Sequence, residues 1–194
     1  MRRAALVLAL LIAAPSRARG DSLYDGVGIG TAAPRGELAQ RFSADGEVGG
    51  RAHVGWRRDD IAIEGSFFGT DLHTAGGKHA GYSTLSFAAG VKGYAPITPV
   101  VALFARAALD YTWLVANEPG GVTIDSAGPG WDLGTGVEAA WRWTVPQPSP
   151  LRCVGTSLWL DAGIQHMHLR SPDAPTIDGG LAEVTLGFSF DASW

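Results

Sequence analysis

The chain has 194 residues, a formal net charge of −4 and a charged fraction of only 18%. No basic cluster is present, so the composition does not favour a nucleic-acid partner, and the single cysteine, Cys153, excludes an intrachain disulfide. Beyond a short apolar segment at the start, no window has the roughly 18 uninterrupted apolar residues of a membrane-spanning helix.

The first twenty residues have the pattern of a secretory signal peptide. Arg2 and Arg3 form a charged start, and an apolar run follows over 4–14. The run is too short to span a bilayer as a helix. Small residues allow cleavage after Gly20, with cleavage after Ala18 as the alternative. We therefore expect a signal peptide over 1–20 and one mature domain over 21–194.

The mature chain divides into segments that alternate between apolar and polar residues. The last segment shows this best, since Val184, Leu186, Phe188 and Phe190 alternate with polar or small residues up to the aromatic Trp194. A period of two predicts a β-strand with two unlike faces. Eight such segments are expected, at 24–32, 47–57, 60–70, 82–95, 100–116, 130–145, 155–168 and 182–194. We place the prolines in the connections, because proline cannot donate to a strand ladder.

The phase of the charges indicates which face meets lipid. In every segment the charged side chains are assigned to one phase, and the other phase is read as apolar and free of charge. A cationic side chain on a lipid-facing surface at mid-depth costs on the order of 2–4 kcal/mol. The charges therefore predict the interior of a transmembrane barrel, with a lumen network of Glu64, Lys92, Arg106, Asp110, Glu138, Arg142 and Asp161. A soluble barrel such as a lipocalin is the main alternative, but it would place the large apolar side chains inside.

Connection lengths and aromatic residues orient the predicted barrel. The connections after the second, fourth and sixth segments are mostly short and the others long, as in outer-membrane barrels with both termini in the periplasm. Aromatic side chains at the segment ends suit the membrane interface, where one end of the ring is apolar and the other is wet. The expected aromatic girdle is Trp56, Tyr94, Trp113, Trp131, Trp141, Trp143 and Trp194.

These features together resemble the small outer-membrane barrels of the OmpA/OmpX type. The resemblance implies an all-β, eight-stranded, antiparallel, up-and-down barrel in the bacterial outer membrane, with outer-membrane lipids around it. It also implies that the closing segment, which ends at Trp194, is read by the barrel-assembly machinery. Phenylalanine is the usual last residue in such proteins, so tryptophan is a mild departure that keeps an aromatic ring.

The interior charges allow two functional hypotheses. One is a hydrogen-bonded ion network that fills the lumen and holds the barrel rigid, since buried charges must be paired. The other is a narrow ion-conducting pore. An eight-stranded barrel is just filled by side chains, which favours the filled lumen over the pore.

A hydrolase is a further alternative. Eight-stranded outer-membrane lipid A deacylases place a His-x-Ser pair near the top of the penultimate strand and an acid in the last strand. His166, His168, Ser171 and Glu183 lie in similar places, but the position two after His166 is histidine rather than serine. A nucleophilic serine needs its base within hydrogen-bond reach. Metal binding by the His166–His168 pair lacks a third fixed ligand.

The sequence therefore favours a non-enzymatic barrel with a structural or surface-interaction role in the cell envelope. We expect no cofactor, no metal, no nucleic-acid partner and no stable protein partner.

Overall fold

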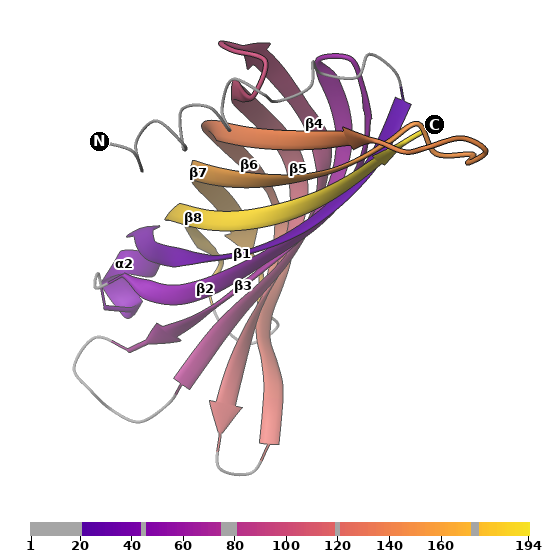
Figure 1. Cartoon of the computed structure of the whole chain (residues 1–194). Helices are drawn as coiled ribbons and strands as arrows, with labels where there is room; N and C mark the ends of the chain where they lie inside the picture. Colours follow the sequence, from indigo (N-terminus) through magenta and orange to yellow (C-terminus); the bar gives the residue numbers. More distant parts are fainter. Residues whose placement is uncertain (1–20, 44–45, 75–80, 119–120, 172–174) are drawn as a thin grey trace, which may run out of the picture.

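The computed structural model describes residues 21–43, 46–74, 81–118, 121–171 and 175–194. The predicted signal peptide lies outside these residues. Figure 1 shows that the described chain is built almost entirely of strands, with one short helix. The elements are β1 (Asp21–Gly36), α2 (Leu38–Arg41), β2 (Glu47–Arg58), β3 (Ile61–His73), β4 (Gly81–Pro96), β5 (Val101–Glu118), β6 (Gly121–Thr144), β7 (Cys153–Leu169) and β8 (Ile177–Ser193). None of the described helical segments has the length and apolarity needed to cross a membrane.

The expected eight-stranded, antiparallel, up-and-down barrel is confirmed. Each strand pairs with the next, and β1 also pairs with β8, which closes the sheet. Ser22 lies opposite Ser193 in the closing pair, so β1 begins and β8 ends at the same rim (Figure 1). We call this end the terminal rim. The end where β1 stops at Gly36 and β8 starts at Ile177 is the distal rim.

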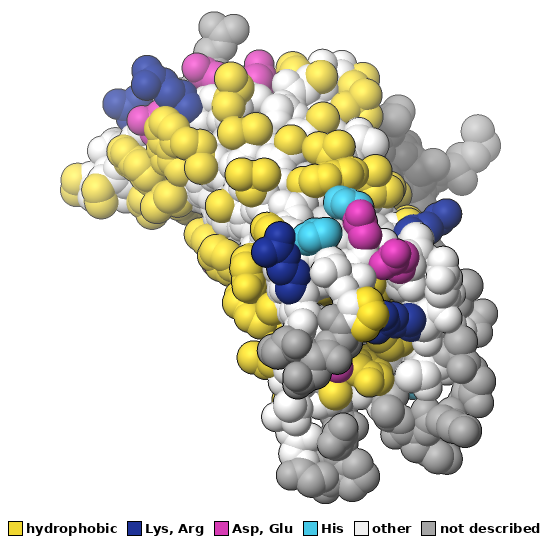
Figure 2. Space-filling view, turned by 180° about the vertical axis from the view of Figure 1, so that it is seen from behind, with side chains coloured by type: hydrophobic (Ala, Val, Ile, Leu, Met, Phe, Trp, Pro, Cys, Tyr) yellow, Lys and Arg dark blue, Asp and Glu magenta, His cyan; other side chains and the backbone are white. Residues whose placement is uncertain are grey.

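Side-chain alternation gives the barrel an apolar outer surface. Most outward side chains of the strands are large and hydrophobic, and they leave a broad apolar surface in Figure 2. Members from every strand are exposed, among them Val27, Val54, Ile63, Phe87, Leu109, Leu133, Leu160 and Leu186. A continuous apolar exterior of this size is typical of a barrel whose solvent is lipid.

One acidic residue breaks the expected separation of charge. Asp25 shares the phase of Leu23 and Val27, and its side chain is exposed on the outer surface. It lies opposite Val54 of β2 and Phe190 of β8. The expectation that the apolar phase carries no charge is therefore wrong at this position, which lies close to the terminal rim, where the surroundings are less apolar.

The hairpin of β5 and β6 is longer than predicted. The sixth strand starts at Gly121 rather than at 130, so most of the expected long connection is strand. The hairpin projects beyond the other strands at the bottom of Figure 1. Pro129 and Pro34 lie inside strands, against expectation. Pro34 lies beyond the β1–β2 pairing, which reaches only to Ala32, and Pro129 lies in a gap of the β6–β7 pairing between Gly130 and the isolated bridge from Ala127 to Arg170. Proline is tolerated where the backbone is unpaired on one side.

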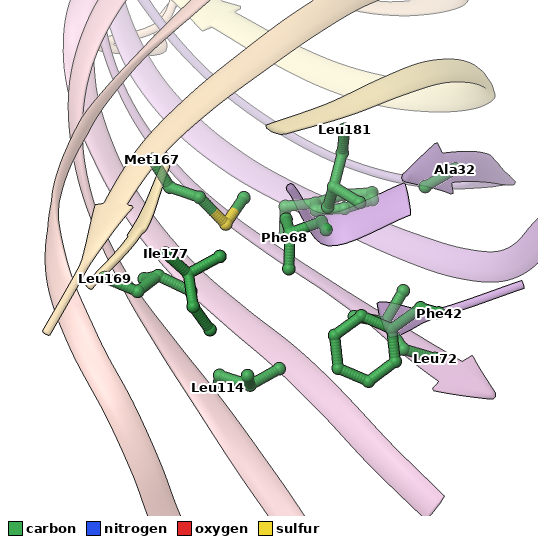
Figure 3. Packing of buried hydrophobic residues seen from close by; sticks show 10 residues of the cluster. Ala32, Phe42, Phe68, Leu72, Leu114, Met167, Leu169, Ile177 and Leu181 are labelled. Atoms are coloured by element: carbon green, nitrogen blue, oxygen red, sulfur yellow. The ribbon is translucent and has the colours of Figure 1, made fainter. Parts of the chain in front are cut away.

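An apolar cluster fills the lumen near the distal rim. Figure 3 shows these side chains pointing toward one another from several strands and from the segment around α2. The cluster consists of Ala32, Leu38, Phe42, Phe68, Leu72, Leu114, Met167, Leu169, Ile177 and Leu181, all buried. The sequence analysis predicted a charged lumen and did not predict an apolar cluster within it.

The helix α2 is held against β8. Gly36 adopts a positive φ of 62°, which a glycine reaches without strain, and turns the chain back over the barrel mouth. The Glu37 carboxylate then accepts a hydrogen bond of 2.7 Å from the backbone N–H of Asp178. This turn directs Leu38 into the apolar cluster, where it is fully buried.

Candidate functional site

The centre of the lumen contains a network of two arginines and three carboxylates. The Arg106 guanidinium lies 2.7 Å from Asp161 Oδ2 and 2.6 Å from Glu183 Oε1, and it also contacts Asp132. Arg51 lies 3.1 Å from Asp132 Oδ2 and contacts Glu183 as well. All five side chains are buried. The network therefore joins β2, β5, β6, β7 and β8 across the barrel interior.

Small residues in the wall make room for Arg106. Gly134 and Gly163 lie opposite each other in the β6–β7 pair. A Cβ atom added to either glycine would lie 2.7 Å from a guanidinium nitrogen of Arg106. A larger residue at these positions would displace the arginine, so glycine is required for this close approach.

A second group of charges lies nearer the terminal rim. Lys92 Nζ is 3.7 Å from Glu64 Oε2, and the Tyr24 hydroxyl donates a 2.8 Å hydrogen bond to the same carboxylate. Lys92 also lies 4.1 Å from the ring centre of Phe104, a cation–π contact.

Two more ion pairs complete this group. Arg57 is 3.6 Å from Glu138, and Arg142 is 2.5 Å from Asp191. The cavity between these side chains measures only about 10 Å³, which is room for about one water molecule.

The structure places the seven predicted lumen charges inside the barrel. Six of them have ion-pair partners: Glu64, Lys92, Arg106, Glu138, Arg142 and Asp161. The seventh, Asp110, instead accepts a hydrogen bond from the Gln165 side chain. The phase of the charges assigned Arg51, Asp132, Glu183 and Asp191 to the lumen face, but the predicted network did not include them. Arg57 was not assigned, although it alternates with outward residues of its strand in the same way.

One predicted girdle residue is wrong. Tyr94 is buried in the lumen, where the Arg57 guanidinium lies 3.8 Å from its ring centre. It shares the phase of Lys92, two residues earlier, and a shared phase fixes a shared face. The other predicted girdle residues lie on the outward phase: Trp56, Trp113, Trp131, Trp141, Trp143 and Trp194.

The residues of the hydrolase alternative are not brought together. Glu183 points into the lumen and pairs with arginines, whereas His166 is 41% exposed and stacks on Trp131 on the outside. His168 shares the outward phase of His166, and Ser171 follows the end of β7. The acid that His166 does meet is Asp178, with 3.0 Å between Nε2 and Oδ1. Within the described ranges, no three side chains of metal-binding type are close enough to hold an ion.

Solved structures share this architecture. The structure of Neisserial surface protein A matches with a TM-score of 0.58 and 14% identity, over 88% of this chain and 96% of that one. Ail, the attachment invasion locus protein of Yersinia pestis, matches with a TM-score of 0.51 and 15% identity, over 90% of this chain and 99% of that one. The sequence matches no protein-family profile and no curated protein. At 14–15% sequence identity, structural similarity to these proteins shows a shared fold. The chain has the fold of the small eight-stranded outer-membrane β-barrel proteins.

Proposed function

We propose that this protein is an integral barrel of the bacterial outer membrane with a closed lumen, and that its role is structural or in surface interaction. The observation that carries the proposal is the reversal of the usual soluble pattern. Large apolar side chains cover the outside, while charged side chains are buried and paired inside. Only a surrounding of lipid makes this arrangement stable, because water would favour the opposite one.

The filled lumen argues against transport. The Arg106 network crosses the centre of the lumen, and the apolar cluster fills its distal end. The cavity near the terminal rim has a volume of only about 10 Å³. A conducting pore needs a continuous water path, and eight strands enclose little more than their own side chains.

The distal rim is proposed to face the outside of the cell, with both termini in the periplasm. Two short turns, 59–60 and 97–100, lie at the terminal rim beside the longer 145–152 connection, while α2 and the projecting β5–β6 hairpin lie at the other end. Short periplasmic turns and larger outer loops are the common pattern of these barrels. Neisserial surface protein A and Ail, an attachment invasion locus protein, are named for the cell surface and for attachment, which supports a role at the surface for this fold.

Cysteine labelling of intact cells tests location and orientation together. Cys153, the single cysteine, starts β7 at the terminal rim. A membrane-impermeant maleimide should leave the native protein unlabelled and should label a Cys153→Ser, Gln40→Cys variant, whose new thiol lies on the exposed side of α2. If the native protein is labelled in intact cells and the variant is not, the orientation is the opposite of the one proposed. Recovery of both proteins in the soluble fraction would overturn the membrane assignment.

A further inference from the structure

A groove on the outer surface lies near the distal rim and is not part of the lumen. It has a volume of about 630 Å³ and is lined by residues of β1, β6, β7 and β8, among them Arg35, Trp131, His166 and Asp178. Figure 2 shows histidine, acidic and basic side chains together where the apolar surface ends. Charged side chains on the outward face at this level contrast with the apolar belt beside them.

The polar end of the groove presents hydrogen-bond donors from two sides. Gly180 of β8 lies between Arg35 of β1 and His166 of β7 in the strand register. Two strand spacings separate these residues by roughly 10 Å, and Gly180 places no side chain between them. A single anionic group bound over Gly180 could therefore receive hydrogen bonds from both the guanidinium and the imidazole.

Asp178 and Trp131 fix the position of the imidazole. The carboxylate oxygen Oδ1 of Asp178 lies 3.0 Å from Nε2 of His166. On the other side, the Trp131 ring stacks on the imidazole with centroids 5.3 Å apart and an interplanar angle of 29°. These two contacts hold the imidazole in place at the polar end of the groove.

The groove continues toward the middle of the barrel as an apolar hollow. This second hollow, of about 440 Å³, is lined mainly by apolar residues and glycines, and also by Thr135 and Glu183. The apolar residues and glycines are Leu133, Gly134, Ala162, Gly163 and Ile164. Ile164 lines both spaces, so the two are adjacent. The combined groove thus has a polar end at the distal rim and an apolar end within the lipid-facing belt.

We propose that this groove binds a phosphorylated lipid of the membrane leaflet at the distal rim. The phosphate lies against Arg35 and His166, and an acyl chain lies along Leu133, Ala162 and Ile164. Phosphate suits the polar end because the planar guanidinium donates two parallel hydrogen bonds to oxyanions of this shape. The proposal rests on the membrane location proposed above, since only a membrane places acyl chains along the second hollow.

Native mass spectrometry of the purified, detergent-solubilised protein tests the site, with diphosphoryl lipid A as the probe. We expect the wild-type protein to retain the lipid. In an Arg35→Gln, His166→Gln variant, the lipid-bound fraction should fall at least about tenfold, because hydrogen bonds to the phosphate are lost. Arg41→Gln is the matched control, since Arg41 is exposed on α2 at the same rim but does not line the groove. Heat-modifiable gel migration shows whether each variant is folded.

Three outcomes would overturn the lipid assignment. They are equal retention by the double variant and the wild type, equal retention of dephosphorylated lipid A, and displacement of the lipid by inorganic phosphate at equal concentration. The last result would mean a site for free phosphate. These outcomes are independent of the cell-labelling experiment, so failure of the site and failure of the membrane location are distinguishable.

Discussion

The centre and the distal end of the lumen are filled by opposite kinds of side chain. The centre is an ion network around Arg51 and Arg106, whereas the distal end is an apolar cluster that includes Leu38 of α2. The two regions meet where the Arg51 guanidinium lies 5.5 Å from the ring centre of Phe68. This difference supports the proposed closed lumen. Paired charges fill the interior where strands alone form the wall, and hydrophobic side chains fill it where the segment around α2 covers the mouth.

Removal of Arg106 should have the largest effect on stability. Arg106→Ala leaves three buried carboxylates, Asp132, Asp161 and Glu183, short of a cation. Breaking a buried ion pair from one side costs about 3–5 kcal/mol. Urea unfolding in lipid vesicles measures the change. Arg58→Ala is the control, because the Arg58 side chain is 70% exposed and its ion pair with Asp21 should contribute about 0–1 kcal/mol. Equal effects of the two variants would contradict the network.

Truncation in the apolar cluster should be the next largest effect. Leu181 of β8 is fully buried in the apolar cluster, so Leu181→Ala leaves a cavity. Such cavities cost about 3 kcal/mol. Val122→Ala on the projecting hairpin, where the side chain is 73% exposed, should change stability by less than about 0.5 kcal/mol. A similar small loss at Leu181 would mean that the distal cluster is not packed.

Loss of the Tyr24 hydroxyl should have a smaller effect. Tyr24→Phe removes the 2.8 Å hydrogen bond to Glu64 but leaves the Lys92 ion pair in place. One hydrogen bond to a charged group contributes about 1.5–3 kcal/mol at most, and the remaining cation reduces this toward about 1 kcal/mol. Tyr111→Phe on the outer surface is the matched control. An unchanged unfolding free energy for Tyr24→Phe would remove Tyr24 from the network.

The smallest effect is expected at an exposed ion pair outside both regions. His73 and Glu47 are 2.7 Å apart near the distal rim, and the His73 side chain is 68% exposed. His73→Ala should cost about 0–1 kcal/mol, because solvent screens exposed pairs. The same vesicle unfolding assay measures it. A loss as large as that of Arg106→Ala would mean that burial does not separate the strong from the weak pairs.

Alternation along the chain was sufficient to predict the eight strands and the face of most charges, but it missed the outward Asp25 and the start of β6 at Gly121. Two further failures have identifiable physical causes. Tyr94 was assigned from its place at a strand end rather than from its phase, although it shares the phase of Lys92. The distal cluster could not be predicted because Leu38 and Phe42 come from a connection, where no period of two applies.

Pairing within the lumen was also beyond the sequence pattern. Arg106 meets Asp132 of the next strand but also Asp161 and Glu183 of strands farther around the barrel. These partners depend on closure of the sheet and on the stagger of the strands, which phase does not determine. For the same reason the pattern could not show that His166 meets Asp178 on the outside, although the phase of Glu183 did predict its place in the lumen.

We propose that these two regions close the lumen. Planar-bilayer recording of the purified wild-type protein in concentrated potassium chloride tests this, and we expect insertion without stable unitary conductance. Reproducible, long-lived conductance steps from folded, heat-modifiable protein would mean that the lumen is open.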